Sequence, residues 1–315
     1  MTLHCAFIGF GKSTTRYHLP YVLHRKDRWQ VAHIYRRRAK PEEQAPQYSH
    51  IHFTSDLEEV LNDPLVKLVV VCTHADSHFE YAKKALEAGK NVLVEKPFTP
   101  TLEEAKTLFA LANSKGLTVT PYQNRRFDSC FLTTKKVIES GKLGELVEIE
   151  SHFDNYRPLA ETNPGGPQNG EFYGLGVHTL DQIISLFGRP DHVSYDLRSL
   201  RNKANPDDTF EAQLFYGDMK AIVKTSHLVQ IDYPKFIVHG HKGSFVKYGI
   251  DQQETSLKAN IMPGEPGFGA DDSVGELVYV NEAGKTVREA VPLASGDYGW
   301  LYGACSEHLN HAQPN

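Results

Sequence analysis

Three titratable side chains stand in settings where they could move a proton or hold a reacting oxygen. Lys96 follows a short apolar run and precedes a proline, which keeps the lysine out of the helical region. There it could orient a substrate hydroxyl or, beside a cation that lowers its pKa, exchange a proton with it. His178 and Asp181 share one face of a helical pattern, and a first-turn histidine is favoured as the neutral base. Taken alone, Lys96 could instead be an ordinary surface lysine, and His178 could be a structural histidine.

Two glycines follow the first apolar run and could bring the backbone close to an anion. In the stretch AFIGFGKSTTRYH, Gly9 and Gly11 come between a predicted strand and a predicted helix. Dinucleotide-binding turns of the type G-x-G-x-x-G occur in this context, with the pyrophosphate at the start of the helix. Thr14 replaces the usual third small residue, and a turn without a ligand is the alternative. We expect the cofactor to be held by Gly9, Phe10, Gly11, Lys12 and Ser13.

A basic run at the end of the second predicted strand could determine whether NAD or NADP binds. Arg36 lies 22 positions after Thr14. Roughly 20 positions after the third residue of the motif, dinucleotide-binding domains carry either an acid that binds the ribose of NAD or an arginine that accommodates the 2′-phosphate of NADP. A guanidinium matches phosphate oxygens in a bidentate way. Arg36 and Arg37 therefore favour NADP, with NAD also possible, while a solvated basic turn is the alternative.

Two further segments could contact a substrate. The turn-rich loop over residues 154–172 leads directly to His178 and contains Tyr156 and Arg157, which could cover a polar substrate. The alternative is an irregular surface loop. Arg126, in the stretch YQNRRFD, either contacts substrate or braces the junction between two domains.

The elements that must position these residues alternate between strand and helix over the first 120 residues. Nearly all-apolar strands joined by helices predict a parallel sheet that is covered on both faces. The expected strands are Leu3–Gly9, Gln30–Tyr35, Leu68–Thr73, Asn91–Glu95 and Leu117–Pro121. The expected helices are Leu57–Leu61, Phe79–Ala88 and Leu102–Ser114, the last with a capping box at Thr101 and Glu104.

From about residue 146 the pattern changes to longer runs with period 2, which predict one antiparallel sheet. A helical pattern over Val177–Phe187 separates the first of these strands from the others. We therefore predict an α/β protein with two domains. Residues 1–121 form a Rossmann domain with a doubly wound parallel sheet, and residues 122–315 form an α+β substrate domain with a large open antiparallel sheet.

The composition excludes several classes of protein. The 315 residues include 34 Lys and Arg against 39 Asp and Glu, a net charge of −5, which disfavours a nucleic-acid partner. No apolar run is long enough to span a membrane, and no secretory signal is visible. Four scattered cysteines form no C-x-x-C pair, so we expect no metal site and a reduced, cytoplasmic protein.

Several motifs occur in a specific order along the chain. They are GFGKST at Gly9–Thr14, VCTHADSH at Val71–His78, EKP at Glu95–Pro97, NRRFD at Asn124–Asp128, SGKLGEL at Ser140–Leu146 and GLGVHTLD at Gly174–Asp181. In this order and spacing the chain resembles the Gfo/Idh/MocA family, which includes glucose-fructose oxidoreductase and inositol dehydrogenase. The resemblance implies hydride transfer between a nicotinamide and a hydroxyl-bearing carbon of a sugar or polyol. It also implies a homodimer or homotetramer that forms through the open sheet.

The resemblance assigns roles to particular residues. Lys96 matches the lysine beside nicotinamide and substrate, and His178 matches the histidine that donates or accepts the proton. Further cofactor contacts are implied at Thr73, His74, His78 and Glu95.

The sequence also departs from the family pattern. Gly174 stands where many members have an aspartate, so either Asp181 orients the histidine or the proton relay is built differently. His74 and Ala75 replace a proline and an asparagine. The family usually continues with another helix and strand, so we expect that the chain is cut short. A non-catalytic NAD(P)-binding regulator and an enzyme for a non-sugar substrate are the alternative functions.

Overall fold

The chain folds into two compact units. The computed structural model describes residues 2–159 and 164–311. One unit contains residues up to 123, together with 254–268 and the C-terminal segment from 298, and the other contains 124–253 and 269–297. The chain first passes from one unit to the other after residue 123, two residues beyond the predicted domain boundary at 121. The two later segments depart from the prediction, because the sequence assigned all of 122–315 to the second domain.

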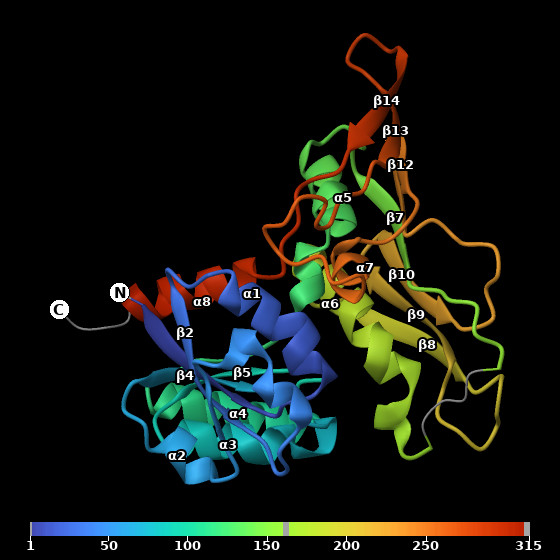
Figure 1. Cartoon of the computed structure of the whole chain (residues 1–315). Coiled ribbons are helices and arrows are strands. Elements are labelled where there is room, and N and C mark those ends of the chain that lie inside the picture. The colour runs from blue at the N-terminus through green and yellow to red at the C-terminus, as the bar shows by residue number, and fades with distance from the viewer. Residues whose placement is uncertain (1, 160–163, 312–315) are drawn as a thin grey trace. The chain divides into compact units, whose positions relative to one another are not determined.

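The first unit is built on a six-stranded parallel sheet in the order β3-β2-β1-β4-β5-β6. Its strands are β1 (Leu3–Ile8), β2 (Trp29–Tyr35), β3 (His52–Thr54), β4 (Val66–Val71), β5 (Asn91–Val94) and β6 (Val119–Pro121). Figure 1 labels β2, β4 and β5 of this sheet. The predicted doubly wound sheet is confirmed, and the sequence missed only the three-residue edge strand β3. Because the strand order reverses between β1 and β4, the carboxyl ends of these strands form the crevice in which such sheets bind ligands.

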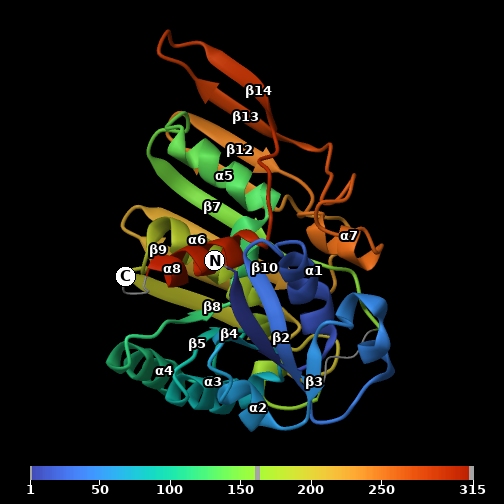
Figure 2. The same ribbon diagram turned by 60° about the vertical axis from the view of Figure 1, so that its left-hand side comes forward.

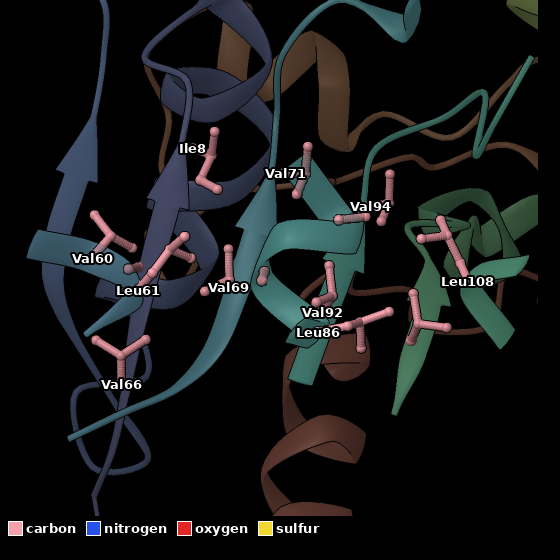
Figure 3. Close-up of a cluster of buried hydrophobic side chains, with 14 of the residues drawn as sticks. Ile8, Val60, Leu61, Val66, Val69, Val71, Leu86, Val92, Val94 and Leu108 are labelled. Carbon is pink, nitrogen blue, oxygen red and sulfur yellow. The ribbon is translucent and has the colours of Figure 1, made fainter. Parts of the chain in front are cut away.

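Helices cover this sheet and bury its apolar side chains. They are α1 (Leu19–Leu23), α2 (Leu57–Leu61), α3 (His78–Glu87), α4 (Leu102–Ser114) and α8 (Trp300–His311), while α7 spans Gln253–Lys258. Figure 3 shows Val69, Val71, Val92 and Val94 of β4 and β5 in one cluster with Leu86 of α3. The predicted capping box of α4 is present. No helix in the described ranges is long and apolar enough to cross a membrane.

The second unit is built on an eight-stranded sheet in the order β14-β13-β12-β11-β7-β10-β9-β8. Its strands are β7 (Leu146–His152), β8 (His192–Arg198), β9 (Thr209–Tyr216), β10 (Met219–Ser226), β11 (Phe236–Gly240), β12 (Gly243–Lys247), β13 (Val274–Val280) and β14 (Thr286–Pro292). The sheet is antiparallel as predicted, except that β7 and β10 run parallel. Helices α5 (Ser129–Glu139) and α6 (Val177–Phe187) lie on one face of it (Figure 2). Val137 and Ile183 of these helices belong to the apolar cluster that is buried against the sheet.

Candidate functional site

A cavity of about 820 Å³ lies at the carboxyl ends of β1, β2 and β4. The side chains and backbone that line it come from the loops that follow these strands and from the start of α3. They are Gly9, Phe10, Gly11, Lys12, Ser13, Tyr35, Arg36, Arg37, Arg38, Lys40, Cys72, Thr73, His74, Asp76, Ser77 and Tyr81. The structure therefore brings together all five predicted loop residues, both predicted arginines, Thr73 and His74.

The turn after β1 requires glycine at its first position. Gly9 has φ +111°, and a Cβ there would lie 2.7 Å from the backbone oxygen of Cys72. Gly11 has open space where a Cβ would stand, so its backbone is accessible from the cavity. Thr14 is fully buried and its hydroxyl donates to the Gly9 carbonyl at 2.8 Å. The unusual third residue of the motif thus closes the turn by a side-chain hydrogen bond instead of by close packing of a small residue.

The basic rim of the cavity contains one arginine that is already paired. Arg36 donates from Nε and from a terminal nitrogen to the two carboxylate oxygens of Glu43, at 2.7 and 2.9 Å. The hydrogen bond from Arg36 lowers the pKa of Glu43, which also accepts from the backbone N–H of Lys40. Arg37 and Arg38 are exposed on the same rim. Arg36 is therefore held in a fixed orientation with its charge balanced, whereas the net positive charge of the rim comes from its neighbours.

His78 lies outside the lining of the cavity. It is 1% exposed, and its ring nitrogens are 2.8 Å from the Pro97 carbonyl and 3.1 Å from the Thr73 carbonyl. His78 therefore ties the loop after β4 to the loop after β5. Its effect on a cofactor would come through Thr73, which lines the cavity.

Glu95 is a buried carboxylate at the end of β5. It accepts hydrogen bonds from the Ser13 hydroxyl, from His18 Nε2 at 2.9 Å and from the backbone N–H of Lys96 at 2.9 Å. Burial by itself would raise its pKa, but the hydrogen bond and the electrostatic interaction with His18, together with the nearby positive charge of Lys96, outweigh that effect and lower the pKa to about 2. Glu95 therefore stays ionised and joins the glycine-containing loop to the backbone of Lys96.

The second unit carries His178 and Asp181 on α6, while Lys96 belongs to the first unit. His178 is 5% exposed. Both oxygens of Asp181 accept hydrogen bonds from Arg126, each at 2.7 Å. Two predicted site residues are thus brought together, with Asp181 holding Arg126. A direct role of Asp181 in orienting His178 stays a prediction.

A carboxylate that the sequence analysis missed lies beside Gly174. Residues 171–187 form one continuous helical stretch that includes a π-helical turn over Phe172–Gly176. A Cβ on Gly174 would be 3.2 Å from Oε2 of Glu171, and the other carboxylate oxygen is 3.3 Å from Nε2 of His227. Burial lowers the pKa of His227 to about 4, so this imidazole is neutral near pH 7. The missing side chain at Gly174 leaves space that the Glu171 carboxylate enters.

The predicted substrate loop is only partly described, since residues 160–163 lie outside the described ranges. Tyr156 pairs with Leu228 in a β-bridge and is 51% exposed. The carbonyl of Arg157 accepts a hydrogen bond from Arg201 at 2.9 Å. The start of the loop is therefore fixed to neighbouring segments by its backbone, with the Tyr156 side chain exposed.

Two models of one oxidoreductase family match the chain. The NAD-binding Rossmann-fold model matches residues 3–123, and the C-terminal alpha/beta domain model matches residues 135–315. The uncharacterized oxidoreductase YhhX of Escherichia coli is 82% identical over 100% of this chain and 91% of its own length. The scyllo-inositol 2-dehydrogenase (NADP(+)) IolW of Bacillus subtilis is 34% identical over 98% of this chain and 86% of its own.

Solved structures agree with these matches. The crystal structure of a probable oxidoreductase yhhX has a TM-score of 0.97 at 82% identity, covering 100% of this chain and 91% of that one. An oxidoreductase from Bacillus cereus has a TM-score of 0.95 at 47% identity, with the same coverage. The chain therefore belongs to the Gfo/Idh/MocA family of oxidoreductases and has the family's NAD-binding Rossmann fold.

Proposed function

We propose that this protein is an NADP-preferring dehydrogenase or reductase that acts on a CH–OH group of a sugar, polyol or related small molecule. The observation that carries the proposal is the cavity at the carboxyl ends of β1, β2 and β4. Its Gly9 turn leaves no room for a side chain, and its rim is basic, so the residues present fit a phosphate-bearing dinucleotide. The sequence similarity to an NADP(+)-dependent inositol dehydrogenase supports the same substrate class.

The cofactor preference depends on the rim that follows β2. Arg37 and Arg38 supply exposed guanidinium groups for a 2′-phosphate, and Arg36 presents the part of its guanidinium that Glu43 does not engage. Of the described residues that line the cavity after β2, none is a carboxylate that could accept a hydrogen bond from an unmodified ribose, and Glu43 is engaged by Arg36. These features favour NADP over NAD.

The proposed chemistry gives separate roles to Lys96 and His178. The bound nicotinamide would supply or accept the hydride. Lys96, whose backbone Glu95 fixes, would hold the reacting oxygen through its ammonium group. His178 would take the hydroxyl proton during oxidation and return it during reduction.

Glu171 is a candidate for the carboxylate that many family members have at the position of Gly174. Its Oε2 lies beside Gly174, one helical turn before His178. We propose that Glu171 takes part in holding the substrate or the proton at this end of α6. Asp181, which is engaged by Arg126, would then stabilise the arginine.

We also propose a homodimer or homotetramer formed through the sheet of the second unit. All seven residues of the edge strand β8 are exposed, and they include the apolar side chains of Val193, Tyr195 and Leu197. Sedimentation velocity of the wild type and of Tyr195→Glu tests this assignment. A monomeric wild type would contradict it.

The experiment that tests the function is a screen for turnover at the nicotinamide absorbance. Purified protein is incubated with NADP⁺ and a panel of inositols, polyols and sugars, and with NADPH and the matching ketones. His178→Gln serves as the inactive control. We expect turnover of at least one hydroxyl compound that depends on His178. Tight cofactor binding without turnover across the panel would instead support a non-catalytic regulator.

A further inference from the structure

A lysine that the sequence analysis missed lines the cofactor cavity beside its glycine-containing turn. Lys40 follows the arginines after β2, and its Nζ donates a hydrogen bond to the carbonyl of Phe10 at 2.5 Å. The same ammonium lies 5.9 Å from the centroid of the Phe10 ring, within the range of a cation–π interaction. A side chain from the loop after β2 therefore reaches across to the loop after β1.

Both partners in this contact are anchored within the first unit. The backbone N–H of Lys40 donates to Oε1 of Glu43 at 2.8 Å, and the Lys40 carbonyl accepts from the Glu43 backbone N–H at 3.1 Å. Phe10 is 4% exposed, and its ring packs edge-on against the rings of Tyr48 and Phe53. Because the backbone of the lysine and the ring of its partner are both held, the ammonium has a defined position at the cavity wall.

The three arginines of the rim are placed differently. The guanidinium of Arg36 is engaged by Glu43. The charged groups of Arg37 and Arg38 make no hydrogen bond or ion pair with any residue that the structure describes. Ordering such side chains around an anion costs conformational entropy, whereas the Lys40 ammonium is already in position.

The Lys40 ammonium has donors left for a ligand. A lysine ammonium carries three N–H donors, and the Phe10 carbonyl accepts one of them. The residue is exposed and lines the cavity, so a molecule bound there can reach the ammonium. The oxygens of a phosphate accept strong, charge-assisted hydrogen bonds from such a donor.

The position of Phe10 indicates which phosphate of a dinucleotide would meet this ammonium. The Phe10 ring packs on Phe53 of β3, so the ammonium lies on the β2–β3 side of the turn. The pyrophosphate is expected at the start of the following helix, whereas the 2′-phosphate is expected beyond the end of β2. We propose that the Lys40 ammonium binds the 2′-phosphate of NADP and is a determinant of the preference for NADP over NAD. This inference rests on the proposed cofactor site.

The test measures cofactor affinity and needs no substrate. Dissociation constants of NADPH and NADH are measured by calorimetry for the wild type, Lys40→Met and Lys106→Met. Methionine keeps an unbranched side chain and removes the charge. Lys106 is the matched control, because its side chain is 61% exposed on α4 and it does not line the cavity.

We expect Lys40→Met to weaken NADPH binding about tenfold or more and to change NADH binding by less than about threefold, because only NADPH carries the 2′-phosphate. Lys106→Met should change neither constant by more than about twofold, since solvent screens so distant a charge. Unchanged NADPH binding, or equal weakening of NADPH and NADH by Lys40→Met, would overturn the inference. If the wild type binds neither cofactor, the proposed cofactor site itself is wrong.

A second measurement uses the wild type alone and so does not depend on the folding of a variant. Lysines are acetylated with an N-hydroxysuccinimide ester of acetic acid, and the modification of Lys40 and Lys106 is followed by mass spectrometry. Saturating adenosine 2′,5′-bisphosphate should slow the acetylation of Lys40 several-fold, whereas saturating adenosine 5′-monophosphate should not. The acetylation of Lys106 should be the same with both nucleotides. Equal protection of Lys40 by the two nucleotides, or none by the bisphosphate, would overturn the assignment to the 2′-phosphate.

Discussion

Replacing Arg36 by alanine should affect folding more than a rim arginine normally would. The guanidinium makes two charge-assisted hydrogen bonds to Glu43, and the two side chains are only 15% and 6% exposed. Removing one partner of a buried ion pair costs about 3–5 kcal/mol, because the other charge is left desolvated. The backbone N–H of Lys40 still bonds Glu43, and some solvent reaches the pair. We therefore expect Arg36→Ala to lower the free energy of unfolding by about 2–4 kcal/mol.

The assay is a double-mutant cycle with urea denaturation, followed by tryptophan fluorescence, to which the buried Trp29 contributes. Arg36→Ala, Glu43→Gln and the double variant are compared with the wild type, and Arg37→Ala is the matched control because that arginine is exposed. The double variant should recover about 1.5–3 kcal/mol relative to the sum of the single changes. A coupling below about 0.5 kcal/mol would refute the reasoning and leave Arg36 available as an unpaired phosphate ligand.

Four further outcomes follow from the same contacts. Arg37→Ala should weaken NADP binding about tenfold or more and leave NAD binding nearly unchanged, because one charge-assisted contact contributes about 1.5–3 kcal/mol. Equal losses of affinity for both cofactors, measured by calorimetry, would contradict the assignment. His178→Ala should lower turnover about 10²-fold or more at unchanged cofactor affinity, and near-normal steady-state rates would remove it from the chemistry. Gly9→Ala should destabilise the fold by at least about 1 kcal/mol in urea, since its Cβ would meet the Cys72 carbonyl; a stable variant would show that the loop can shift. The pKa of Glu95 in the folded state, about 2, lies below its ordinary value of 4.5. The contribution of Glu95 to the free energy of unfolding is therefore complete above about pH 4.5 and is lost as the pH falls toward 2. An acid-unfolding profile identical to that of Glu95→Gln would contradict this.

The regular parts of the fold could be predicted because each was specified by neighbouring residues. Runs of buried apolar residues identified the parallel strands, and Thr101 with Glu104 marked the start of α4. The edge strand β3 was missed because its three residues include only one apolar side chain and so form no apolar run. The return of α8 to the first unit was also missed, since it depends on contacts such as that of Trp29 with the Tyr302 carbonyl at 3.0 Å.

The cavity could be located from sequence, but its electrostatics could not. The glycines and arginines follow strand ends, and the topology of a parallel sheet brings such positions together. The partner of Arg36 is Glu43, in a short 3-10 helical turn seven residues away, and no pattern relates the two. His18, which bonds the buried Glu95, contacts Tyr302 at a separation of 284 residues. Glu171 was missed because only the fold shows that its carboxylate enters the space left by Gly174.

We propose that the cavity after β1, β2 and β4 holds NADP in preference to NAD. Titration of the purified protein with NADPH and with NADH, followed by nicotinamide fluorescence, tests it most directly. We predict saturable binding of both, with NADPH bound about tenfold or more tightly because of its additional phosphate contact. Tighter binding of NADH, or no saturable binding of either cofactor, would contradict the account.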